Sequence, residues 1–165
     1  MDNLRLNDLS ARVTALNLGV ADKDGELLFT AGENCMNHVI AEGESAGETV
    51  KVKVVTLDSA LASQCPAIIK IDVEGFETLV LRGAAETLAN PTLHSVIIEL
   101  NGGCNRYGFD EDAIVATLKT HRFDSYSYEP FSRTLTSLNG GRNATGNTLF
   151  IRGIEQARQR SAAAA

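Results

Sequence analysis

The first half of the chain alternates apolar and polar residues over short stretches. A period of two is typical of strands that keep one face in solvent. We therefore predict strands over residues 12–20, 26–30 and 49–57. Asp24-Gly25 predicts the turn between the first two strands. Residues 31–48, rich in Gly, Glu, Asn and Ser, are expected to form a loop or an irregular hairpin arm.

The second half has longer apolar runs, which are typical of parallel strands buried on both faces. Between them, apolar residues recur at helical spacing, and Asp110 is placed to cap a helix. The predicted elements are strands 67–73, 95–100, 125–128 and 147–152, a helix over 76–89, and a helix after Asp110. This alternation of strands and helices predicts an α/β sheet with right-handed crossovers. Residues 2–10 carry leucines that predict a further helix, or the end of one.

The composition narrows the class of protein. The 165 residues are 44% hydrophobic and 22% charged, as expected for one domain, which we place at residues 1–153. Residues 154–165 have little to bury and are expected to fray. A net charge of −6 argues against a nucleic-acid partner, and no apolar run approaches the about 20 residues of a membrane span. The three widely spaced cysteines and the polar start of the sequence favour a cytoplasmic protein.

Three charged residues stand at the end of the predicted strand 67–73. Lys70, Asp72 and Glu74 alternate with apolar residues, so on a strand their side chains point to one side. Ligands of open α/β sheets bind at the carboxyl ends of strands, which makes these three residues candidates for a site. The alternative is structural: Lys70 forms an ion pair with one of the acids, and Glu74 begins the next helix.

Glu99 repeats this arrangement one strand later. If the two strands are neighbours, Asp72, Glu74 and Glu99 converge, and carboxylates so placed can act as a general base, bind a hydroxyl or hold a divalent metal. The alternative for Glu99 is a solvated strand end. His38, in the predicted loop, is a weaker candidate for contact with a substrate.

Several segments resemble one known family in both order and spacing. They are Thr56-Leu57-Asp58, residues 69–77 (IKIDVEGFE), residues 80–84 (VLRGA) and residues 96–99 (VIIE), with residues 15–25 (ALNLGVADKDG) before them. In these features the sequence resembles the FkbM family of S-adenosylmethionine-dependent methyltransferases.

The resemblance implies a Rossmann-like methyltransferase fold with a mostly parallel sheet and a C-terminal antiparallel strand. It implies the strand order 3-2-1-4-5-7-6, with residues 12–20 as strand 3 and 67–73 as strand 4. It also implies methylation of a hydroxyl on a small metabolite, sugar or polyketide, with S-adenosylmethionine as the donor. Asp72 would lie near the donor methyl and the acceptor, and Ala21 and Asp22 near the adenine of the donor.

The sequence departs from the family pattern in one respect. Strands 1 and 2 and their glycine-rich loop have no counterpart, so we expect a partial fold that binds the donor weakly or not at all by itself. Strand 67–73 would then expose an apolar edge. An alternative function is a non-catalytic domain that forms a homodimer, or binds a partner, through this edge. A third is a metal enzyme built on Asp72, Glu74 and Glu99.

Overall fold

The computed structural model describes residues 2–163. It contains two sheets, a three-stranded sheet in the order β1-β3-β2 and a five-stranded sheet in the order β4-β5-β8-β6-β7. The strands are β1 (Gly19–Val20), β2 (Gly25–Thr30), β3 (Thr49–Val55), β4 (Ile68–Ile71), β5 (Ser95–Glu99), β6 (Asp124–Glu129), β7 (Thr134–Ser137) and β8 (Asn147–Ile151). The α-helices are α1 (Asp2–Leu6), α2 (Leu57–Leu61), α3 (Glu77–Arg82), α4 (Ala85–Ala89), α5 (Glu111–Thr120) and α6 (Ile154–Ala163), and the 3₁₀ turns are η1 (Asn34–Met36) and η2 (Gly103–Tyr107).

The fold is mixed α/β, and the expectation of a mostly parallel sheet is wrong. Among the strand pairs described, β1–β3 and β4–β5 are parallel, and the other pairs are antiparallel. β6 and β7 form a hairpin, and β8 inserts between β5 and β6. A parallel pair needs a long crossover connection, which the short β6–β7 link cannot provide. The order β4-β5-β8-β6 nevertheless agrees with the implied order 4-5-7-6.

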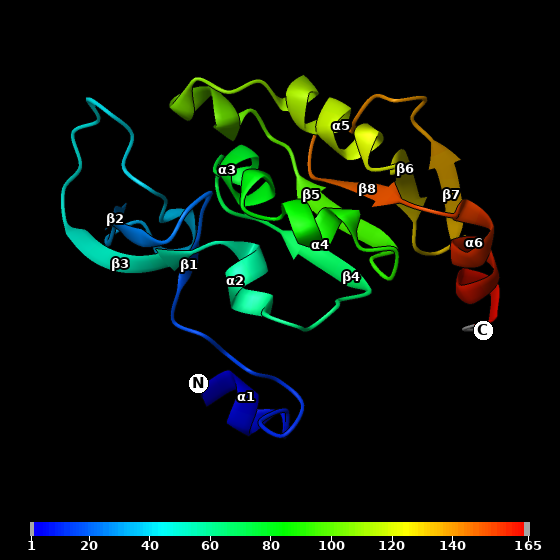
Figure 1. Cartoon of the computed structure of the whole chain (residues 1–165), viewed down its shortest axis with the longest axis horizontal. Coiled ribbons are helices and arrows are strands. Elements are labelled where there is room, and N and C mark those ends of the chain that lie inside the picture. Colours follow the sequence, from blue (N-terminus) through cyan, green and yellow to red (C-terminus); the bar gives the residue numbers. More distant parts are fainter. Residues whose placement is uncertain (1, 164–165) are drawn as a thin grey trace.

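The predicted strand over residues 12–20 forms only at its end. Gly19 and Val20 pair with Val54 and Val55 of β3, while the residues before them pair with no strand among those described. Leu16 is 59% exposed, and α1 lies apart from the body of the molecule (Figure 1). Alternation predicts which side chains face a core, but a strand also needs a neighbour for its N–H and C=O groups.

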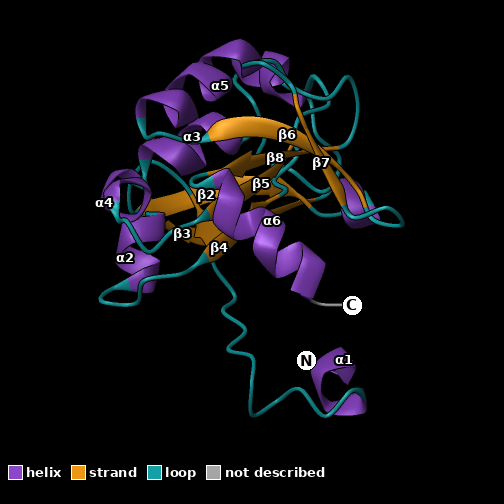
Figure 2. Cartoon of the chain, turned by 90° about the vertical axis from the view of Figure 1, so that its right-hand side faces the viewer, coloured by secondary structure: helices purple, strands orange, loops and turns teal. Residues whose placement is uncertain are grey.

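Helices cover one face of the five-stranded sheet. Val96 and Ile98 of β5 and Phe150 of β8 are buried in the main core with residues of α3, α4 and α5. Figure 2 shows these helices on one side of the strands and α6 on the other. The prediction that strand 67–73 is buried on both faces is wrong, because β4 is an edge strand and Ile68 is 59% exposed.

The predicted helix 76–89 is divided into α3 and α4 at Gly83. A Cβ atom at Gly83 would lie 2.1 Å from the carbonyl oxygen of Ala21, so the chain bends where the helix meets β1. The Asp58 carboxylate accepts hydrogen bonds from the N–H groups of Glu86 and Thr87 at the start of α4. The hydroxyl of Thr56 caps α2.

The Asp58 carboxylate also accepts a hydrogen bond from the Thr87 hydroxyl, at 2.6 Å. Burial raises the pKa of Asp58, but these hydrogen bonds outweigh burial and hold the pKa below its usual value. The segment Thr56-Leu57-Asp58 therefore has a structural role, because it links α2 to α4.

The strand β7 and the helix α6 were not among the predicted elements. β7 extends the sheet beyond β6, and α6 occupies most of the tail that we expected to fray, with residues 164–165 outside the described part. Within residues 2–163, no helix has both the length and the apolar character needed to cross a bilayer.

Candidate functional site

The carboxyl ends of β4 and β5 place two acids side by side. These strands are parallel neighbours, and Ile71 is the partner of Ile98 in the ladder. Asp72 follows Ile71 directly, and Glu99 follows Ile98, so both acids stand one position beyond the same pair. The predicted adjacency of the two strands is confirmed.

Asp72 has an ion-pair partner. The ammonium group of Lys70 donates a hydrogen bond to the Asp72 carboxylate, and both side chains are about half exposed. The two residues share one side of the strand, as the alternation predicts. This ion pair is the structural alternative that we considered for Lys70, and it leaves the Asp72 carboxylate accessible from solvent.

Glu74 is placed by a bend and not by the strand. β4 ends at Ile71, so the alternation that would align Glu74 with Lys70 and Asp72 does not reach it. Glu74 and Gly75 have consecutive positive φ angles of 52° and 100°. The carbonyl oxygen of Glu74 accepts a hydrogen bond from the Arg106 guanidinium at 3.5 Å. The expectation of three charges on one side of a strand is therefore wrong for Glu74.

The geometry does not support a metal site formed by these acids. In the part of the chain that the structure describes, no group of three His, Cys, Asp or Glu residues is arranged to hold a metal ion. Glu99 is half buried at the end of β5, opposite Asn147 of β8. The hypothesis of a metal enzyme built on Asp72, Glu74 and Glu99 thus has no geometric support.

Ala21 and Asp22, the residues implied to lie near the donor adenine, follow β1. Ala21 is only 1% exposed, belongs to the smaller core cluster with Phe76, and donates its N–H to the carbonyl of Val55. Asp22 is exposed. Of the two residues, only Asp22 presents a side chain to solvent, so its carboxylate is accessible to a ligand.

An aromatic contact joins this cluster to the loop after β5. The rings of Phe76 and Tyr107 meet edge to face, with centroids 5.1 Å apart. The Tyr107 hydroxyl donates a hydrogen bond to the carbonyl of Val39 at 2.6 Å. Burial raises the pKa of Tyr107, so the phenol stays protonated as this donor at neutral pH. Tyr107 thus links the connection between β2 and β3 to the loop after β5, beside the candidate site.

Sequence reasoning missed the buried carboxylate of Glu77. This residue ends the IKIDVEGFE segment, is 3% exposed, and accepts hydrogen bonds from the Gly75 N–H and the Cys104 thiol. In the sequence, Glu77 is visible only as an acid at the start of a helix. Acids are common there because they interact favourably with the helix dipole, so the pattern gives no sign of burial. Only the fold shows that the side chain turns inward.

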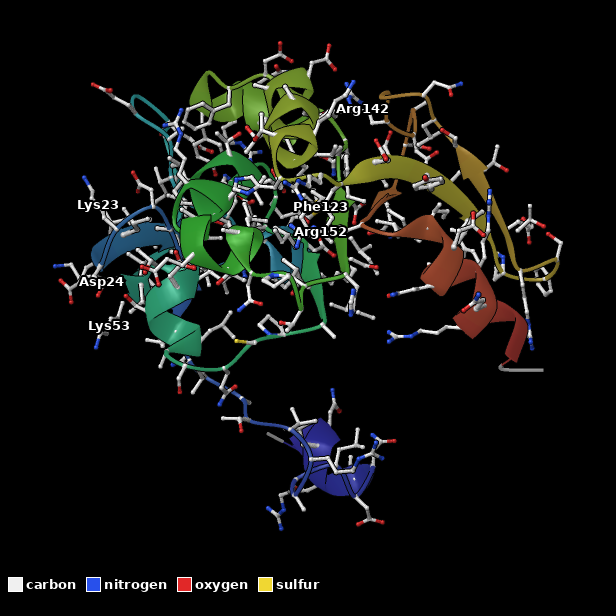
Figure 3. The ribbon with its side chains drawn as sticks, turned by 45° about the vertical axis from the view of Figure 1, so that its right-hand side comes forward. Lys23, Asp24, Lys53, Phe123, Arg142 and Arg152 are labelled. Carbon is white, nitrogen blue, oxygen red and sulfur yellow. The ribbon has the colours of Figure 1, made fainter. Side chains whose placement is uncertain are left out.

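A second cluster at the other end of β5 is structural. The Arg152 guanidinium lies 4.2 Å from the centre of the Phe123 ring (Figure 3) and donates hydrogen bonds to the carbonyl groups of Leu88, Asn90 and His121. Burial, followed by the charge of Arg122, lowers the pKa of Arg152. Because every nitrogen of the guanidinium donates to a backbone carbonyl, Arg152 is engaged in holding α4, α5 and β8 together.

Together these features define a class: a mixed α/β domain with accessible carboxylates at the carboxyl ends of two parallel strands. The model of the methyltransferase FkbM domain matches residues 1–129, and the chain belongs to this family. None of the curated proteins matches the chain.

Among solved structures, the chain is similar to the crystal structure of methyltransferase FkbM from Methylobacillus flagellatus KT. The TM-score is 0.53 at 12% sequence identity, and the match covers 91% of this chain and 31% of that one. At this identity the likeness concerns the fold alone. The chain thus spans about a third of the length of that protein.

Proposed function

We propose that the chain forms the acceptor side of an S-adenosylmethionine-dependent O-methyltransferase that acts on a hydroxyl of a small metabolite, sugar or polyketide. Membership of the FkbM methyltransferase family supports transfer of a methyl group. The single observation that carries the proposal is the position of Asp72 and Glu99, one step beyond the Ile71–Ile98 pair at the carboxyl ends of neighbouring parallel strands. Ligands of α/β sheets bind at this edge.

The reaction needs an acceptor oxygen in line with the donor methyl group and a base for the hydroxyl proton. When bound, the donor supplies an electrophilic methyl group on a sulfonium. Asp72 or Glu74 would accept the proton of the acceptor hydroxyl, which would free the oxygen to attack that methyl group. Lys70 holds the Asp72 carboxylate by its ion pair, and Glu99 bounds the acceptor pocket. Most of the rate acceleration then comes from positioning.

The exposed carboxylates of Asp22 and Asp72 fit part of the donor, because they can accept hydrogen bonds from its ammonium and ribose hydroxyl groups. The sequence has no G-x-G-x-x-G turn to bring backbone N–H groups close to a ligand. β1 and β4 are both edge strands in their sheets. We therefore expect weak donor binding by this chain alone, and full activity once another polypeptide segment pairs with these edges.

A titration of ¹⁵N-labelled chain with S-adenosylmethionine, followed by NMR, tests the proposal. We expect saturable shifts of the amide signals of residues 21–22 and 72–75, with a dissociation constant of about 1 mM or weaker. Asp72→Asn should weaken binding about tenfold, because one charge-assisted hydrogen bond is lost. Asp112→Asn, at an aspartate that is 82% exposed on α5, is the matched control and should bind like the wild type.

Absence of any shift at about 10 mM donor, ten times the expected dissociation constant, would contradict donor binding by this site. Equal affinities for the wild type and Asp72→Asn would contradict the role given to Asp72.

A further inference from the structure

Glu77 carries a buried carboxylate that the proposed reaction does not use. It is the first residue of α3 and is 3% exposed. Burying a charged carboxyl group is unfavourable unless hydrogen bonds replace the lost water. The partners of Glu77 therefore show what keeps this charge inside the fold.

Both carboxylate oxygens have a partner, and the two partners come from different loops. Oε1 accepts a hydrogen bond from the N–H of Gly75 at 3.1 Å, and Oε2 accepts one from the thiol of Cys104 at 3.2 Å. Cys104 is fully buried, and its burial, reinforced by Glu77, raises the pKa of the thiol to about 12. At neutral pH the thiol thus keeps its proton and acts as a donor.

The two loops that Glu77 joins are those at the candidate site. Gly75 belongs to the bend after β4, which carries Asp72 and Glu74, and Cys104 belongs to η2, in the loop after Glu99. The loops touch, since a Cβ atom at Gly75 would lie 2.3 Å from the carbonyl oxygen of Gly103.

The bend is also strained. Glu74 has a φ of 52°, a left-handed conformation that non-glycine residues adopt at a cost of about 1 kcal/mol or more. Gly75 follows with a φ of 100°. Such a backbone persists only when surrounding contacts hold it. The N–H of Gly75, at the centre of this bend, donates a hydrogen bond to the Glu77 carboxylate.

We infer that Glu77 is a positioning residue that clamps the bend after β4 to the loop after β5 and so sets where the carboxylates of Asp72, Glu74 and Glu99 stand relative to one another. Its part in catalysis rests on the proposed function. The arrangement itself does not, because it can be measured without any ligand.

The experiment compares Glu77→Gln with the wild-type chain by NMR. The amide side chain of Gln keeps the shape of Glu, but it loses the charge and one acceptor oxygen. We expect shifted amide signals at residues 73–75 and 103–105, and hydrogen exchange at Gly75 that is about tenfold faster. In the donor titration, Glu77→Gln should bind about tenfold more weakly or worse, because the carboxylates are displaced.

Two Cys104 variants distinguish loss of the hydrogen bond to Glu77 from a general loss of folding. Cys104→Ala removes the thiol donor and leaves only a small void, so it should reproduce the shifts at residues 73–75. Cys104→Ser restores a hydroxyl donor and should return these signals toward their wild-type positions. Asp58→Asn, at the partly buried carboxylate that caps α4, is the matched control for loss of stability and should leave residues 73–75 unchanged.

The outcomes separate the inference from the proposed function. If Glu77→Gln leaves the signals and the exchange at residues 73–75 unchanged, or if Asp58→Asn alters them as much, the inference is overturned. If these signals move as expected but the wild-type chain binds no donor, the clamp is supported and the proposed function fails. If the donor binds the wild type and Glu77→Gln equally well, the clamp does not position the site, and the inference is again overturned.

Discussion

His38 lies in the connection between β2 and β3 with 4% of its side chain exposed. Its Nδ1 faces the carbonyl oxygen of Met36 at 2.9 Å and the carboxylate of Glu33 at 3.3 Å. Its Nε2 faces the carboxylate of Glu44 at 2.9 Å. Both ring nitrogens therefore meet acceptors, an arrangement that favours the doubly protonated imidazolium.

The surroundings of His38 raise its pKa, which also favours the imidazolium form. Burial lowers the pKa, and the charge of Arg106 opposes protonation, but the hydrogen bonds to Glu44 and Met36 outweigh both and raise the pKa above 6.5. On the partner side, the Ala41 N–H and then His38 lower the pKa of Glu44. His38, a weaker candidate for substrate contact from the sequence, thus holds residues 31–48 in place.

We predict that this pair makes stability depend on pH. A raised folded-state pKa means that the contribution is fully present below about pH 6.5 and is lost as the pH rises through the folded value. The free energy of unfolding from urea denaturation should fall in the wild type as the pH rises from about 6.5 through the raised pKa of His38. His38→Gln should remove that part of the fall. An identical pH dependence in both proteins would contradict the prediction.

At the scale of elements, close backbone approaches decide where helices begin and end. Gly83 stands at the end of α3, where its missing side chain makes room for the carbonyl of Ala21 after β1. The Asp58 carboxylate then provides the cap for α4, and the Asp24 carboxylate accepts the N–H of Thr56 at the end of β3. The family-like segments around these residues therefore fasten the three-stranded sheet to the helices, whereas residues 70–74 and Glu99 lie at the candidate site.

Gly83→Ala should disrupt this junction. The added Cβ would stand 2.1 Å from the Ala21 oxygen, so either α3 or β1 must move. We expect a loss of about 1–3 kcal/mol in the free energy of unfolding, measured by urea denaturation. Gly25→Ala is the control, since nothing lies within 4 Å of a Cβ atom built there, and it should change stability by less than half a kcal/mol, about the usual range for surface changes. Equal effects of the two substitutions would refute the role of Gly83.

At the scale of the whole molecule, α3, α4 and α5 cover one face of the five-stranded sheet, whereas the other face, where α6 lies, is only partly covered (Figure 2). The partly covered face holds a groove of about 240 Å³ next to α6, lined by apolar side chains that include Ile97, Leu149 and Ile68. β4 forms the adjoining edge of the sheet. Exposed apolar strand edges invite pairing with another chain.

We predict that the β4 edge mediates association between copies of this chain at high concentration. Ile68→Lys places a charge on the edge and should weaken self-association at least about tenfold, as measured by sedimentation velocity across a concentration series. Met36→Lys is the matched control, because Met36 is 55% exposed in η1 and Ile68 is 59% exposed. If the wild-type chain stays monomeric at all concentrations, the edge is not an association surface.

The sequence predicted several strands and helices of the second half, although not β7 or α6, because long apolar runs and capping residues are local signals. β5, α5 with its Asp110 cap, and β8 were all expected, as was the parallel pairing that brings Asp72 beside Glu99. A strand over residues 12–18 and the continuation of strand 67–73 toward Glu74 were predicted wrongly. Residues 12–18 lack a neighbouring strand to pair with, and a bend after β4 interrupts the alternation before Glu74. A pattern of period two shows neither the missing partner nor the bend.

By itself, the sequence determined the types of most elements and the strand ends at which the candidate acids lie, since both follow from local residue patterns, and its motifs resemble those of the FkbM family. The tertiary structure alone decided that Glu77 turns inward to the thiol of Cys104 and that Asp58 caps a helix 28 residues away. These features depend on contacts between segments distant in sequence, and such contacts form only when the whole chain packs.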